Sequence, residues 1–142
     1  MSRRRSRLRS ARRRRRRRRV GTSGTVADVL VDTDVFIDHL RGARPLRTDG
    51  HRLHYSVITR AELFAGTHGV REAAALLASL VEVPVDRTIA ERAGRIRRTT
   101  GIRLPDALIA ATAMARSMML ATRNRRDFDR IPGLALYPET EA

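Results

Sequence analysis

The 142-residue chain is predicted to fold as an α/β domain with a mostly parallel sheet of four or five short strands. Short apolar runs alternate with segments of helical periodicity from residue 26 onward, which is typical of βαβ units. Residues 26–142 have the length of one domain and can bury a single core. The chain contains no cysteine, which excludes a disulfide-stapled fold, a thiolate metal site and a cysteine nucleophile.

Two strands and three helices are predicted in the first half of this domain. Asp34 is placed to cap the first helix, and Ser56 or Thr59 the second. Leucines and alanines recur at helical spacing after Gly69, which predicts a third helix that packs on the core. The predicted strands are 29–32 and 53–56; the predicted helices are 34–40, a segment from 56 or 59 to about 66, and a segment from about 70 to 80.

The second half is predicted to contribute the remaining strands and the most buried helix. Pro84 interrupts one strand and places it at a sheet edge. Asp86 is predicted to cap the helix that Gly101 ends. Pro105 suits the first turn of a helix that is apolar nearly all round, as expected of a central buried helix. The predicted strands are 81–85, 118–122 and 134–137; the predicted helices are 86–101, 106–117 and a short piece after the polar turn 123–127.

The formal net charge of +15 is concentrated at the N-terminus. Residues 3–19 contain 13 arginines, which leaves 17 arginines against 15 acidic residues from Val20 onward. We interpret residues 1–25 as a disordered arm, because a like-charged segment without aromatic residues cannot bury enough surface to offset its ordering entropy. No apolar stretch is long enough to span a bilayer and no secretory signal pattern follows the arginines, so we expect a cytoplasmic protein.

Asp32 is the first candidate for chemistry. It closes the first predicted strand, and ligands of open α/β sheets bind at the carboxyl ends of parallel strands. The alternative is that Asp32 caps the following helix, but Asp34 already fits that role. We therefore expect a functional role for Asp32 and a capping role for Asp34.

Glu62 and Asp106 each have a structural alternative. Glu62 interrupts a helical stripe of small and apolar residues, where a salt bridge, for instance with an arginine, explains it as well as function does. Asp106 begins the predicted buried helix, where interaction with the helix dipole is worth roughly 0.3–1 kcal/mol. Taken alone, the helix dipole is the better explanation of Asp106.

Asn124 and Asp127 lie in the turn after the fourth predicted strand, where turn and capping roles are common. In a parallel sheet this turn, Asp32 and Asp106 can all lie at one edge. Two carboxylates about 4 Å apart repel by roughly 4 kcal/mol at an effective dielectric constant of 20, so such a cluster requires a cation. Oxygen ligands without cysteine or a histidine set favour Mg²⁺ or Mn²⁺. The histidines show no metal-binding spacing, and we expect them in packing or surface roles.

Four motifs along the chain, taken together, resemble the PIN-domain family, and specifically the VapC-type toxins of toxin–antitoxin pairs. Any one of the four is a weak signal, but their order and spacing together are specific, and the resemblance runs from about Val29 to Pro138. It implies a three-layer α/β/α fold and a Mg²⁺- or Mn²⁺-dependent endoribonuclease. The motifs are VLVDTDVFIDHLRG at 29–42, SVITRAELFAG at 56–66, LPDALIAATA at 104–113 and LATRNRRDFDRIPGL at 120–134.

The resemblance also assigns roles to individual residues. It implies that Asp32 and Asp106 bind the metal ion, that Glu62 is the family's glutamate, and that the hydroxyl of Thr122 helps to order the site. The family often has Asp where this chain has Asn124, and Asp127 is the nearby acid of the RDF tripeptide. The missing charge at Asn124 leaves the number of bound metal ions open.

The implied partners are an RNA substrate, a VapB-type antitoxin and a second copy of the chain in a homodimer. Hydrolysis by a metal-activated water would leave a 3′-hydroxyl and a 5′-phosphate. Arginines that could contact RNA phosphates are Arg60, Arg103, Arg123 and Arg125, although solvated surface charge explains each equally well. The alternative function is that of a catalytically weak nucleic-acid-binding protein that uses the basic arm. A purely structural interaction partner is a third and weaker alternative.

Overall fold

The structure is a computed structural model that describes residues 25–47, 49–67 and 69–138. The predicted arm lies outside the described residues apart from its last residue, and so do positions 139–142. No helix in the described ranges is both long and apolar enough to cross a membrane.

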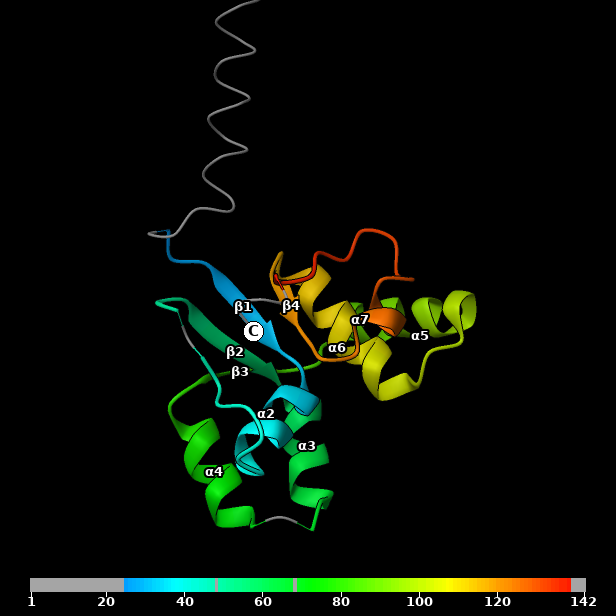
Figure 1. The fold of residues 1–142 in the computed structure, drawn as a ribbon. Helices are drawn as coiled ribbons and strands as arrows, with labels where there is room; N and C mark the ends of the chain where they lie inside the picture. Colours follow the sequence, from blue (N-terminus) through cyan, green and yellow to red (C-terminus); the bar gives the residue numbers. More distant parts are fainter. Residues whose placement is uncertain (1–24, 48, 68, 139–142) are drawn as a thin grey trace, which may run out of the picture.

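The centre of the fold is a sheet in which every strand pairing is parallel (Figure 1). Its strand order within the described chain is β3-β2-β1-β4, so β1 and β2 are central and β3 is an edge strand, as predicted from Pro84. Leu30 of β1 pairs with His54 on one side and with Leu120 on the other. The strands are β1 (Asp28–Val31), β2 (Arg52–Ser56), β3 (Val81–Val83) and β4 (Met119–Ala121).

Helices cover both faces of the sheet, which confirms the predicted three-layer α/β/α architecture. Val29 and Val31 belong to the core cluster on the side of α2, α3 and α4, whereas Leu30 belongs to the cluster formed with α5 and α6. This alternation follows from the two-residue period of a strand, which sends successive side chains to opposite faces. The helices are α2 (Thr33–Leu40), α3 (Val57–Ala65), α4 (Val70–Ala78), α5 (Arg87–Thr100), α6 (Leu104–Ala115) and α7 (Arg125–Phe128).

Several predicted helix boundaries are confirmed by capping contacts. The Ser56 side chain accepts a hydrogen bond from the backbone N–H of Ile58 and so caps α3. The Asp86 side chain does the same for α5 by accepting from Ile89, and Gly101 ends that helix in the left-handed conformation at φ 74°.

The predicted final strand, 134–137, is reduced to a single parallel bridge between Leu120 and Leu136. Leu120 donates to the carbonyl of Ala135 and accepts from the N–H of Tyr137, and the pairing goes no further. Beyond this bridge, the carbonyl of Tyr137 accepts a hydrogen bond from the Arg125 guanidinium at 2.7 Å. The sheet of the described residues therefore has four strands, the lower of the two predicted numbers.

Candidate active site

Asp32 lies at the carboxyl end of β1 and is 4% exposed. Its Oδ1 accepts a hydrogen bond from the backbone N–H of Thr33 at 2.8 Å, and its Oδ2 accepts from the Thr122 hydroxyl at 2.8 Å. The prediction that Asp34 caps α2 is therefore wrong, because Asp32 is the N-cap residue. The reason is that the backbone of Asp32 is still extended, with ψ 155°, while Thr33 already begins the helix.

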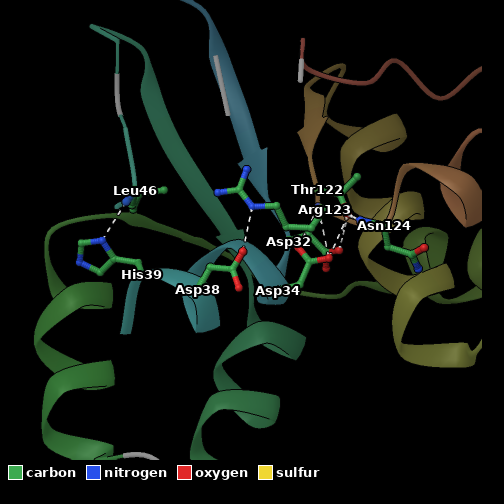
Figure 2. A network of polar contacts seen from close by, with 8 residues as sticks. All are labelled: Asp32, Asp34, Asp38, His39, Leu46, Thr122, Arg123 and Asn124. Atoms are coloured by element: carbon green, nitrogen blue, oxygen red, sulfur yellow. Dashed lines mark hydrogen bonds and ion pairs between the residues drawn. The ribbon is translucent and has the colours of Figure 1, made fainter. Parts of the chain in front are cut away.

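Asp34 instead joins α2 to the loop between β4 and α7 (Figure 2). Its two carboxylate oxygens accept from the backbone N–H of Arg123 at 3.1 and 3.2 Å, and Oδ2 lies 3.4 Å from the Thr122 hydroxyl. Asp32 and Asp34 thus share Thr122 as a hydrogen-bond donor. The loop after β4 is consequently held against the start of α2 by two carboxylates.

Glu62 approaches the same place from α3. Its Oε1 accepts from the Thr33 hydroxyl at 2.7 Å, and this hydroxyl is also 3.0 Å from that of Thr59. The apolar stripe around Glu62 is only partly covered, because Ile58 packs against the core whereas Ala61 and Ala65 are exposed, and the buried positions of α3 are Thr59 and Leu63. Glu62 therefore lies half-buried beside the core, and no ion pair of the described residues includes it.

Asp106 lies in the first turn of α6, as predicted, and is half-buried. The carboxyl group has a raised pKa, chiefly because burial disfavours its charged form, while Arg103 acts in the opposite direction and Glu62 and Asp127 raise the pKa further. Arg103 occupies the N-cap position of α6 without a side-chain capping bond. The start of α6 is thus within electrostatic reach of acidic residues from three other helices, α2, α3 and α7.

Asn124 and Asp127 are paired with each other in α7 and the turn before it. The Asn124 side-chain amide donates to Asp127 Oδ2 at 2.9 Å, and the Asn124 backbone N–H donates to the Thr122 hydroxyl at 3.0 Å. The side chain of Asn124 makes no capping bond to α7, although Asn124 is its N-cap residue. Its amide therefore orients a carboxylate rather than the helix start.

The structure brings all of these acids to one edge of the sheet, which we call the acidic rim: Asp32, Asp34, Glu62, Asp106 and Asp127. Burial raises the pKa of Asp32 to about 8, with Asp34 and Asp106 adding to the shift and the Thr122 hydroxyl opposing it. Burial likewise raises the pKa of Asp34, against the hydrogen bond from the Arg123 backbone. The rim therefore holds carboxyl groups whose negative charges are poorly compensated by the protein.

The donor set of the rim fits a hard divalent cation, because every available ligand atom is an oxygen and a cation would relieve the repulsion among the carboxylates. Within the described ranges no three Asp, Glu or His side chains form a ready-made metal cage. Mg²⁺ does not require one, since it is commonly held by one or two carboxylates and keeps several waters. Asp32 and Asp106 are the residues that would supply those carboxylates.

One ion pair at the rim was not predicted from the sequence. The Arg123 guanidinium pairs with Asp38 of α2 through Nε and Oδ2 at 3.1 Å, and both side chains are largely buried (Figure 2). Asp34 and Asp38 are four residues apart and lie on the same face of α2, so one helix face holds both the backbone and the side chain of Arg123. This i, i+4 spacing is the signal in the sequence that could have identified the pair.

The described histidines have structural roles, as expected. His39 Nδ1 accepts from the backbone N–H of Leu46 at 2.8 Å, and His51 Nδ1 accepts from Ala27 at 3.0 Å. His54 contacts Asp28 at the opposite end of β1. His68 lies outside the described residues.

Comparisons with known proteins agree with this fold and this clustering of acids. The PIN domain family model matches residues 29–134. Ribonuclease VapC10 of Mycobacterium tuberculosis is 46% identical over 110 residues, which cover 68% of this chain and 82% of the relative. Ribonuclease VapC19 of the same organism is 35% identical over 74% of this chain and 95% of the relative.

Among solved structures, a toxin–antitoxin complex from Klebsiella pneumoniae superposes with a TM-score of 0.62 at 30% identity, covering 75% of this chain and 95% of the matched chain. The family match spans β1 to the segment after α7 and therefore contains every residue of the acidic rim. The chain belongs to the PIN domain family and is a relative of the VapC ribonucleases.

Proposed function

We propose that this chain is a Mg²⁺- or Mn²⁺-dependent endoribonuclease of the VapC type that serves as the toxin of a toxin–antitoxin pair. The observation that carries the proposal is the convergence at the carboxyl edge of the sheet of five carboxyl groups from four segments: the junction of β1 and α2, α3, α6 and α7. Relatives named as ribonucleases, at 46% and 35% identity, support RNA as the substrate.

Three acids of the rim and the neighbouring Thr122 have distinct parts in the proposed hydrolysis. Asp32 and Asp106 hold the cation, and the Thr122 hydroxyl fixes the direction of the Asp32 carboxylate. Glu62, anchored by Thr33, orients the attacking water and accepts its proton. When bound, the divalent cation supplies an activated water and offsets the charge that develops on the phosphodiester. The expected products carry a 3′-hydroxyl and a 5′-phosphate.

The test is in vitro cleavage together with sequencing of RNA 5′-phosphate ends after brief expression. The wild-type chain should generate discrete 5′-phosphate ends, and Asp106→Asn should generate none. Asp86→Asn is the matched control, because Asp86 begins the neighbouring helix α5 but is not part of the rim, and asparagine is an equally good N-cap residue. Equal activity of wild type and Asp106→Asn would contradict the assignment.

Cleavage assays together with measurements of RNA binding at several salt concentrations test the alternative of a nucleic-acid-binding protein without turnover. That function predicts salt-sensitive RNA binding that is lost when residues 1–25 are deleted, with no metal-dependent ends in any variant. We also propose a VapB-type antitoxin partner, supported by the toxin–antitoxin complex among the structural relatives, and a homodimer. Light scattering of the purified chain, alone and with a co-expressed antitoxin, checks both.

A further inference from the structure

Charge is divided unequally between the two halves of the folded chain. Residues 26–85, from β1 to the end of β3, contain six arginines and eight acidic residues. Residues 86–138, which form α5, α6, β4 and α7, contain eleven arginines and five acidic residues. The first part therefore has a formal charge of −2 and the second a charge of +6. A polyanion that reaches the acidic rim meets a favourable potential from one side only.

Three of the four arginines considered from the sequence are engaged within the protein. Arg60 pairs with Glu82 and donates to the Tyr55 hydroxyl. Arg123 pairs with Asp38, and Arg125 donates to the carbonyl of Tyr137 at 2.7 Å. Arg103 remains, exposed and close enough to the rim to lower the pKa of Asp106.

Other exposed arginines continue from Arg103 over α5 and α7. The solvent side of α5 carries Arg95 and Arg98, opposite its buried residues, and Arg126 lies on α7 directly before Asp127. The Arg130 side chain donates to the carbonyl of Thr100 and so joins the end of α7 to the end of α5. We call Arg95, Arg98, Arg103 and Arg126 the arginine face. In Figure 1, α5 and α7 lie beside the start of α6, on the side away from α2 and α4.

We infer that an RNA strand bound at the acidic rim continues across the arginine face, where Arg98, Arg103 and Arg126 contact its phosphates, and not across the side of α2 and α4. This inference rests on the proposed function, since it assigns the path of the proposed substrate. No ion pair of the described residues includes any of these three guanidinium groups, so each can bind a phosphate bidentately. The negative half of the chain would instead repel the strand on leaving the rim.

The first experiment measures how the cleavage KM of the full chain depends on salt. Removing one phosphate contact lowers the slope of log KM against log salt concentration by about 0.7 for single-stranded RNA. Arg98→Gln/Arg126→Gln should therefore lower this slope by about 1.4 and raise KM, with kcat unchanged. Arg44→Gln/Arg71→Gln is the matched control, because it removes two exposed arginines from the negative half and should leave the slope as in wild type. Equal slopes for the two double variants would overturn the inference.

The second experiment does not depend on cleavage. Because the chain has no cysteine, a single cysteine can carry a photocrosslinker at one chosen position. With EDTA present, a fluorescein-labelled single-stranded RNA should crosslink to the full chain at Arg126→Cys and much less at Arg71→Cys. The N-terminal arginines are the same in both variants and cancel from the comparison.

The two experiments separate the inference from the proposed function. Crosslinking at residue 126 without any metal-dependent cleavage would contradict the proposed nuclease activity and still support the RNA path. Cleavage with equal crosslinking at residues 126 and 71, or with preference for residue 71, would support the nuclease and overturn the path.

Discussion

Strand β1 has an aspartate at each end, and the two carboxyl groups are in opposite electrostatic states. Asp28 begins the strand, is exposed, and contacts Arg52 Nε and His54 Nε2 at 3.0 Å each. The hydrogen bond from His54, followed by the charge of Arg52, lowers the pKa of Asp28. Asp32 follows the strand, is buried beside other carboxylates, and has a pKa raised to about 8. The residue type and the strand are the same, so the neighbouring elements alone create the difference.

This comparison distinguishes the two edges of the sheet by the charges that surround each aspartate. At the opposite edge, the adjacent strand β2 places the Arg52 guanidinium and the His54 imidazole in contact with the Asp28 carboxylate. At the carboxyl edge, α2 and α6 contribute acids that raise the pKa of Asp32, and α3 and α7 contribute acids that raise the pKa of Asp106. Carboxylates held together in this way are costly unless a cation accompanies them, which is typical of a site and untypical of a structural ion pair.

The largest effect is expected from exchanging a carboxylate for an amide at the two ends of β1. Asp32→Asn should lower Mn²⁺ affinity, measured by calorimetry, by at least about a hundredfold, because it removes a ligand rather than a residue that supports one. It should abolish RNA cleavage as well. Asp28→Asn should change neither quantity, and equal losses in the two variants would show that the ends of β1 do not differ as described.

A smaller effect is expected from the pair that holds the loop after β4. Asp38→Asn weakens the anchor of Arg123 and therefore the placement of Thr122, which orients Asp32. Loss of such a supporting contact lowers metal affinity by about tenfold or more. Glu82→Gln is the control, since it breaks the Arg60 ion pair at the edge strand β3 without touching the rim. Amide exchange at the Arg123 N–H should accelerate in Asp38→Asn only, and unchanged exchange with unchanged affinity would contradict this role.

The pH dependence of stability distinguishes the two aspartates without any RNA. A carboxyl group whose pKa is raised by folding stabilises the fold while it is protonated. For Asp32 this stabilisation is complete below the ordinary pKa of 3.8 and is lost as the pH rises through about 8. The metal-free protein should therefore lose up to about 1.4 kcal/mol per pH unit across this window in urea unfolding.

Two controls isolate Asp32 in that measurement. Asp32→Asn should flatten the decline between pH 4 and about 8, because asparagine does not titrate. Saturating Mn²⁺ should restore the stability of the wild type near pH 8 by binding only the folded state. Identical pH profiles of wild type and Asp32→Asn would show that Asp32 is not the group responsible.

The fold could be predicted from the sequence where the signal was local. The strand formed by Val29, Leu30 and Val31 and the capping residues Ser56 and Asp86 each depend on near neighbours in the chain. The capping role was assigned to Asp34 instead of Asp32 because the two are interchangeable as helix caps by residue type. Their true partners, Thr122 and Arg123, are nearly 90 residues away.

The same distinction applies to the site. The clustering of acids at one sheet edge could be predicted from the parallel topology. The Asp38–Arg123 pair and the exposed side of α3 could not. Ala61 and Ala65 fit an apolar stripe, yet they are exposed, because α4 and the core meet α3 on the side of Leu63. Which side of an amphipathic helix is covered depends on tertiary contacts that periodicity does not contain.

The smallest effect is expected for Asp28 and concerns acid alone. Because folding lowers its pKa, the contribution of Asp28 to stability is present above the ordinary value of 3.8 and is lost as the pH falls through the lower, folded value. Asp28→Asn should therefore be slightly less stable than wild type at neutral pH and equal to it in strong acid. Added salt should shrink the neutral-pH difference, because the Arg52 pair is exposed and screened. A stability difference that does not depend on salt would contradict the exposed state of this pair, since only a pair shielded from solvent resists screening.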